Sequence, residues 1–451
     1  MTPATQRRPD KATEPFWEKF RRFESELSQP SWLLPVRKAG MTRFAELGFP
    51  TLHDEDWRFT NVAPLARLPF KPVFAPLKRD VTFDDLQRFA FNQLPCRRLV
   101  FVDGHYCRGF TPDRPEGGNK DLHIGSLRHA LSAGRAEKYL AHYTKGDDNP
   151  FAALNQAFFH DGAFIHVPAA LAVPEPIHLL FISTSREAGT TVNPRNLIIA
   201  EADSKVTIIE SYVTLDGAAY FTNAVTEIIA GDSAVLEHVK FQDEATDAFH
   251  LATIAGEFGR ASNVRLHSFA LGAKLSRNNI RTKLAGEGLE CILNGLYLAR
   301  GEQLADHHMV VEHAQPHCAS HEYFNGILDG KSKGVFHGRI YVHPVAQKTD
   351  AKQTNKNLLL SDDATADTKP QLEIYADDVK CTHGATVGQL NDESIFYLRS
   401  RGIPENTARR MLIHAFAGEI IERVKCEPVR EQLDKIVWDR LEANLHLAGA
   451  K

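Results

Sequence analysis

The sequence predicts a mainly β protein with a repetitive, stacked core, and two observations carry that prediction. From about residue 161 the apolar residues alternate with a period of two, as in "PIHLLFIS" and "KVTIIESYV", and helical patterns nearly vanish for more than 200 residues. Tight turns recur there at separations of 28, 28 and 27 residues, marked by Asp203, Gly231, Gly259 and Gly286. A repeat of this length is typical of stacked architectures. A β-helix over residues 161–385 accounts for it best, with a jelly roll and a propeller as competing all-β folds.

The N-terminal region, residues 1–160, is predicted to be a mainly helical domain. The stretch "EPFWEKFRRFESEL" places Phe16, Phe20 and Phe23 at helical spacing, and prolines punctuate the chain after "DEDWRFTN". A chain of 451 residues exceeds what one hydrophobic core usually organises, so two or three domains are expected.

The C-terminal region, residues 386–451, is again helical in character. Pro404 suits the first turn of a second helix. One apolar stripe of this helix holds Ala408, Met411, Leu412, Ala415, Phe416, Ile420 and Val424, and a second holds Ile413, Ala417 and Ile421. Two interpretations stay open: one side packs on the chain's own helices and the other on a partner, or a three-helix cluster buries both.

Composition excludes several classes of protein. The 53 basic and 57 acidic residues are well mixed, with a formal net charge of -4, so neither nucleic acid nor a membrane surface is expected as a partner. No stretch has the apolar length needed to span a bilayer. Without a CxxC pair or an N-terminal apolar segment, the scattered cysteines predict reduced thiols in the cytoplasm; they are Cys96, Cys107, Cys291, Cys318, Cys381 and Cys426.

The stretch "DDVKCTHGATVGQL", residues 377–390, holds the main candidate site. If it is extended, Cys381 and His383 share one face with Cα atoms roughly 6.5 to 7 Å apart, close enough to approach one metal ion or cluster. Gly384 and Gly388 follow, which suggests that the chain turns here and that the pair sits at the end of a rung. The pair is a metal site, a nucleophile with its base, or two ordinary strand residues.

A second histidine-rich stretch, "DHHMVVEHAQPHCASHE", is a weaker metal candidate. Its metal-capable groups are His307, His308, His313, His317, Cys318 and His321. Strand alternation places His307 and His313 on one face and His308 on the other, so the ligands diverge. We expect a polar stack on the outside of the β region, facing solvent or another subunit.

The stretch "GILDGKSKG" resembles a phosphate-binding loop but has only three residues between Gly326 and Gly330, and a strand-like segment follows it. No nucleotide is therefore expected to bind this chain. A carbohydrate-active site stays open, because paired carboxylates far apart in sequence leave no local mark.

Four stretches, spread over nearly the whole chain, point to one protein family. They are "DEDWRFTN", "LNQAFFHDGAFIHVP", "DGKSKGVFHGRIYVH" and the long "AQKTDAKQTNKNLLLSDDATADTKPQLEIYADDVKCTHGATVGQLNDESIFYLRSRGI". Together they resemble the SufB/SufD family, the scaffold proteins of the SUF iron–sulfur cluster assembly machinery. The SufB branch differs where this chain reads "KCTHGATVG", so the chain is similar to the SufD branch.

The resemblance implies a right-handed parallel β-helix between N-terminal and C-terminal helical domains, in agreement with the counted repeat. It also implies a non-catalytic, cytoplasmic scaffold subunit that pairs with SufB through the β-helices and docks the SufC ATPase on its C-terminal domain. SufS and SufE are the implied sulfur donors, and a homodimer is implied for the isolated chain.

The family's "C[ST]HG" motif falls on Cys381 and His383, which implies that they bind a transient iron–sulfur cluster shared with SufB, His383 above all. The residues implied to bind SufC are Tyr397, Leu398, Arg401, Met411, Leu412 and Phe416. Two alternatives remain: a β-helix carbohydrate-active enzyme that acts alone, and a stand-alone zinc-binding protein.

Overall fold

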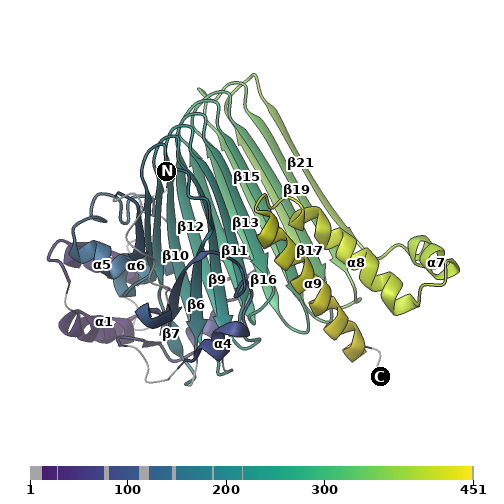
Figure 1. Ribbon diagram of the computed structural model, residues 1–451, viewed down its shortest axis with the longest axis horizontal. Coiled ribbons are helices and arrows are strands. Elements are labelled where there is room, and N and C mark those ends of the chain that lie inside the picture. The colour runs from purple at the N-terminus through teal and green to yellow at the C-terminus, as the bar shows by residue number, and fades with distance from the viewer. Residues whose placement is uncertain are drawn as a thin grey trace.

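Two long sheets of parallel strands form the body of the protein, as the computed structural model in Figure 1 shows. The structure describes residues 13–27, 29–75, 81–110, 121–144, 149–184, 187–215 and 217–448, with side chains to residue 442. From residue 195 to residue 388 successive strands alternate between the sheets, so each rung of this parallel β-solenoid contributes one strand to each sheet.

The first sheet has 11 strands. Along the sheet these are β20 (Thr365–Ile374), β18 (Lys333–Val342), β16 (Leu304–His313), β14 (Leu275–Leu284), β12 (Phe249–Phe258), β10 (Phe221–Ala230), β8 (Arg195–Ala200), β5 (Ala163–Val167) and β4 (His123–Ser126), with β7 (Thr190–Val192) and β1 (Lys71–Pro72) off this path.

The second sheet has 10 strands. These are β21 (Lys380–Gly388), β19 (Asp350–Leu359), β17 (Ala319–Leu328), β15 (Glu290–Ala299), β13 (Asn263–Ala270), β11 (Val235–Asp243), β9 (Lys205–Thr214), β6 (Ile177–Ser183), β2 (Arg97–Val102) and β3 (His105–Tyr106). The predicted mainly β fold with a β-helix core is confirmed, and the jelly roll and propeller are excluded, because neighbouring long strands pair in parallel.

The main hydrophobic core lies between the two sheets. Equivalent residues of successive rungs stack in register, as Ile254, Ile280 and Met309 do on the first sheet. Burial of such columns is the main favourable free energy in a solenoid, because each rung covers the apolar face of the next.

The turns between rungs explain the period seen in the sequence. Asp203, Ser233 and Ala261 each have a positive φ, and the amide of each donates to a carbonyl of the next turn. Beside them the turns stack so closely that a Cβ on Gly286 would lie 2.0 Å from the amide nitrogen of Arg260. Glycine recurs in these turns because the neighbouring backbone leaves no room for a side chain.

This packing predicts that Gly286→Ala destabilises the protein by roughly 1–3 kcal/mol, because the added methyl group meets rigid backbone. Urea unfolding at constant temperature measures the loss. Gly109→Ala is the matched control, since nothing lies within 4 Å of a Cβ at that position. An equal, small effect of both changes would refute this account of the turns.

The N-terminal region packs on one end of the solenoid. Its helical segments are α1 (Glu14–Glu26), α2 (Leu33–Leu47), η1 (Glu55–Trp57), α3 (Ala63–Ala66), α4 (Phe83–Gln87), η2 (Arg108–Phe110), α5 (Leu127–Ser132) and α6 (Pro150–Phe158). The predicted first helix is confirmed, and Phe16, Phe20 and Phe23 are buried on it. This region also adds strands to both sheets, since β2 pairs with β6 and β4 with β5.

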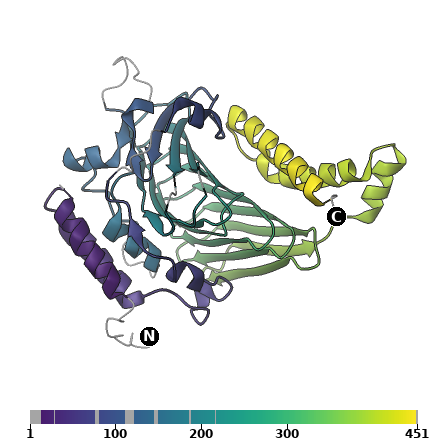
Figure 2. The same ribbon diagram turned by 90° about the horizontal axis from the view of Figure 1, so that it is seen from below.

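The C-terminal region consists of α7 (Asp392–Ser400), α8 (Glu405–Ile421) and α9 (Glu427–Ala448). Helices α8 and α9 lie over the second sheet, and α7 lies beyond it at one end (Figures 1 and 2). The apolar side chains of α8 and α9 pack on the outer face of the sheet against Phe241, Phe269, Leu296, Leu298, Ile327 and Leu358.

The two apolar stripes predicted for α8 do not match the side of the helix that is buried. Ile413 and Ala417 are fully buried, whereas Met411 and Ala415 are exposed. The reason is that α8 packs against both the sheet and α9, and only the side that meets them is covered. Pro404 is the residue before the first turn, since α8 begins at Glu405.

Candidate metal site at the open end of the solenoid

The last rung leaves one end of the solenoid uncovered. Among the described residues, β20 pairs only with β18 and β21 only with β19. Most residues of β21 are exposed, although they continue the buried columns of the rungs before it. An uncovered, regular edge of this kind is a template for pairing with another chain.

Cys381 and His383 lie on the inward face of this last rung. They align with Ala351 and Gln353 of β19, which are both buried. Cys381 is half-buried against the apolar cluster that includes Ala351, while His383 is exposed at the open end.

The expected turn at Gly384 is wrong, because β21 continues to Gly388. The pair therefore lies near the start of a strand and not at the end of a rung. Gly384 does not break the strand, because its φ is not in the left-handed region and no atom crowds it.

Chemically the pair supplies one thiol and one imidazole. Burial, with the nearby charge of Asp350, raises the pKa of the Cys381 thiol, so a metal must displace its proton before the sulfur binds. Within the described part of the chain, the one cluster of three metal-capable groups lies elsewhere. This rung therefore offers two ligands, and a cluster bound here needs others from a second chain.

A buried acid lies beneath His383 in the same column, and sequence reasoning missed it. Glu322 aligns with Gln353, and Gln353 with His383. Gln353 Nε2 donates to Glu322 Oε2 at 2.8 Å, and Glu322 Oε1 has no partner. Gly338 makes room, since a Cβ there would lie 2.0 Å from Gln353 Nε2. The strand register, one rung apart at each step, is the signal that could have revealed Glu322.

Burial raises the pKa of Glu322 to about 8, so the folded protein keeps a proton that the unfolded chain releases near its ordinary value of 4.5. Between these values the native state binds more protons, and its stability falls as pH rises, by about 1.4 kcal/mol per pH unit at most. Glu322→Gln should therefore stabilise the protein at pH 8 and change little at pH 5, measured by urea unfolding at both values. Parallel losses at both pH values would contradict this assignment.

The predicted C-terminal contact residues divide into two groups. Tyr397, Arg401 and Met411 are exposed, and the Arg401 guanidinium lies 5.2 Å from the centre of the Tyr397 ring. Leu398, Leu412 and Phe416 are half-buried. Phe416 also packs on the cluster between α8 and the sheet. Phe396, which is 73% exposed, was missed although it adjoins Tyr397.

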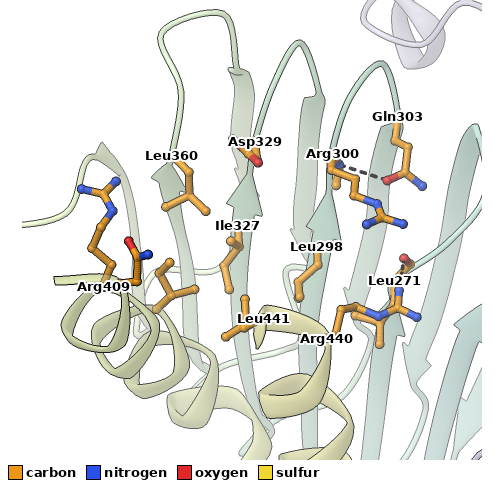
Figure 3. Close-up of a pocket in the computed structure, with 13 residues that line it drawn as sticks. Leu271, Leu298, Arg300, Gln303, Ile327, Asp329, Leu360, Arg409, Arg440 and Leu441 are labelled. Carbon is orange, nitrogen blue, oxygen red and sulfur yellow. Dashed lines mark hydrogen bonds between the residues drawn. The ribbon is translucent and has the colours of Figure 1, made fainter. Parts of the chain in front are cut away.

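A cavity of about 210 Å³ lies between the second sheet and helices α8 and α9 (Figure 3). Its apolar walls include Leu298, Ile327 and Ile413. Arg440 closes one side by donating to the carbonyl of Leu271 at 2.6 Å and to Asp243 at 2.5 Å. The cavity belongs to the packing of the C-terminal helices and is separate from the open end.

The histidine-rich stretch is not the solvent-facing stack that was expected. His307, His308 and His313 are all buried, because the solenoid interior covers His307 and His313 and the N-terminal region covers His308. Only His317, in a turn, is largely exposed among its histidines.

Two family models cover most of the chain. Residues 181–416 match the model described as "SUF system FeS cluster assembly, SufBD core domain", and residues 11–179 match "SufBD protein N-terminal region". The two ranges meet within β6, and the domain boundaries at residues 160 and 385 stay predictions.

Similar proteins extend over nearly the same length. The iron–sulfur cluster assembly protein SufD of Escherichia coli strain K12 is 35% identical over 93% of this chain and 95% of its own. An iron–sulfur cluster assembly SufBD family protein of Synechocystis is 34% identical over 91% of each chain. SufD of Bacillus subtilis strain 168 is 25% identical over 93% of this chain and 96% of its own. Among the described helices, none combines the length and apolar character needed to cross a bilayer.

Proposed function

The chain belongs to the SufBD family of iron–sulfur cluster assembly proteins, and from this we propose that it is a SufD-like scaffold subunit. It pairs with SufB end to end through the solenoids, and it binds the SufC ATPase through α7 and α8. The observation that carries the proposal is the uncovered last rung, whose inward face displays Cys381 and His383 where a second solenoid would meet it.

In this proposal the nascent cluster forms at the boundary between the two solenoids. His383 and Cys381 supply ligands from this chain and SufB supplies the rest, with sulfur delivered through SufS and SufE. The cluster is cargo that must leave, and imidazole ligation leaves it less negative than thiolate would, which suits a scaffold. A cytoplasmic location fits the six cysteines, none of which forms a disulfide.

The experiment that tests this function is co-expression with SufB and SufC, followed by pull-down and iron and sulfide analysis. A scaffold subunit co-purifies with both partners and supports cluster assembly only in their company. Turnover of a polysaccharide by the isolated chain would instead support the carbohydrate-active alternative, which rests on fold analogy alone.

The free edge of β21 suits pairing better than that of β20. Because the Lys380 amide donates to the carbonyl of Thr349, directly before β19, the alternating amides of Cys381, His383, Ala385 and Val387 point away from β19. On β20 the residue at one such outward position is Pro370, which has no amide proton. We therefore assign the main contact to β21.

Pairing predicts that the isolated chain is a homodimer and that Ala385→Pro weakens both this dimer and the SufB complex at least tenfold. The proline removes one outward donor without touching the bonds to β19. Sedimentation analysis over a concentration series measures the change. Ala385→Ser keeps the donor and is the matched control. A wild-type chain that stays monomeric with SufB present would refute the interface.

A further inference from the structure

Asp56, His308 and His337 meet where the N-terminal region covers the first sheet. Asp56 lies on η1, and the two histidines are aligned partners on β16 and β18. One ligand atom from each lies within 4.8 Å of the others. His308 Nε2 is 3.8 Å from Asp56 Oδ1, and the imidazole centres are 4.2 Å apart.

The two imidazoles are buried with unused nitrogen atoms. The His308 side chain is 4% exposed, and neither of its ring nitrogens has a hydrogen-bond partner. His337 Nε2 also has none, although Gln371 hydrogen-bonds the same ring. Buried polar atoms without partners are uncommon in native proteins, and a bound ion would satisfy one nitrogen of each ring. The second hydrogen bond on the His337 ring matches the usual arrangement of a metal-binding histidine, whereas the His308 ring has none.

The imidazoles are in the form that binds metals. Burial lowers the pKa of His308 well below its ordinary value, and nearby cations, first Arg277, lower it further. Burial also lowers the pKa of His337. Burial therefore favours the neutral form of both rings, which keeps a free lone pair.

Three of the neighbouring cations have carboxylate partners of their own. Arg277 Nη1 lies 2.6 Å from Asp306, Lys369 Nζ lies 2.7 Å from Glu55, and Arg339 Nη1 lies 3.7 Å from Glu373. The Asp56 carboxylate lies 3.7 Å from Arg339, as far as Glu373 does, and 3.8 Å from His308 Nε2, so its charge faces both the guanidinium and the histidines.

The segment that carries Asp56 is already fixed in place. The Arg277 guanidinium lies over the Trp57 ring at 3.7 Å and donates to the Asp56 carbonyl at 2.9 Å, and Thr60 donates to Asp306. Small rotations of three side chains would bring the ligand atoms to the separation of about 3.3 Å that bonds of about 2.0 Å to a tetrahedral ion require.

We propose that Asp56, His308 and His337 bind one first-row divalent transition-metal ion, separate from any cluster at the open end. Two imidazoles and one carboxylate suit Zn²⁺ and Fe²⁺ and leave at least one position for water. The ion ties η1 to two consecutive rungs of the solenoid, so it also stabilises the fold by binding the native state alone.

The test uses the full-length protein stripped of metal with a chelator. Zn²⁺ alone, and Fe²⁺ alone without oxygen, are titrated by calorimetry, and bound metal is counted after desalting. The wild type should take one equivalent and gain thermal stability, whereas Asp56→Asn and His308→Gln should bind at least tenfold more weakly and lose the metal-dependent gain.

Two controls separate this site from other histidines. His343→Gln removes a half-buried histidine paired with Glu312, and His383→Ala removes the candidate ligand of the open end; both variants should bind the ion as the wild type does.

A third measurement guards against misfolding. Co²⁺ bound to the wild type should give visible absorption bands, and these should disappear in Asp56→Asn. Because the Asp56 side chain is 34% exposed, the metal-free variant should melt at the same temperature as the metal-free wild type. A wild type without stoichiometric metal, or Asp56→Asn and His308→Gln variants that retain it, would overturn the proposal.

Discussion

The complex assembled with His383→Ala is expected to contain its partner subunits in normal ratio and to form little or no cluster. His383 is exposed on β21, most of whose residues are exposed as well. The substitution therefore removes no buried side chain and should not disturb folding. If the imidazole is a ligand, removing it leaves this chain with the Cys381 thiol alone, whose raised pKa makes it a poor ligand unaided. Iron and acid-labile sulfide, measured on the purified complex, give the result.

Cys381→Ser separates the second candidate from the first. Cys381 is half-buried against the apolar cluster at the last rung, so a purely structural thiol would tolerate serine with a small loss of stability and normal cluster yield. If the Cys381 thiol is instead a ligand, the serine variant should form less cluster. His343→Ala is the matched control, because His343 lies on a neighbouring turn and pairs with Glu312. If His383→Ala and Cys381→Ser both give wild-type cluster yield in an intact complex, neither residue is a ligand.

The second large effect is expected for the C-terminal helices. Tyr397→Ala combined with Met411→Glu should weaken binding of the SufC ATPase by about 30-fold or more. Tyr397 is 57% exposed and Met411 38% exposed, and aromatic residues that are buried on association commonly cost at least about 2 kcal/mol when truncated. Surface plasmon resonance with the full-length chain measures the dissociation constant. Phe83→Ala, which removes a 62% exposed ring on α4, is the control, and unchanged binding by the double variant would refute the assignment.

These point substitutions are a better test than truncation after Ser394, which at first sight should leave the β region folded. Helices α8 and α9 pack on a cluster of apolar residues from the second sheet, among them Phe241, Leu296 and Leu358. Removing them would expose this face and destabilise the solenoid, because buried apolar area is worth roughly 25 cal/mol per Å². Lost binding by the truncated chain would therefore not identify a contact.

Much of the fold is readable from the chain because the signals are local. Period-two alternation and regularly spaced turns reflect contacts between adjacent rungs. The same sequence pattern therefore recurs in every rung whose strands pair with those of the next. The first helix was predictable for a similar reason, since Phe16, Phe20 and Phe23 mark one face of it.

The candidate sites depend on information that is not local. The sequence by itself determined the stacked β core, the helical ends and the Cys381–His383 pair, because strand alternation places residues two apart on one face. Only the tertiary structure placed the pair on an uncovered last rung and Glu322 beneath it, because that follows from the register between strands some 30 residues apart. It also brought Asp56 beside His308 and His337, across more than 250 residues of chain. No spacing rule encodes such a contact, since it is set by how the N-terminal region packs on the finished sheet.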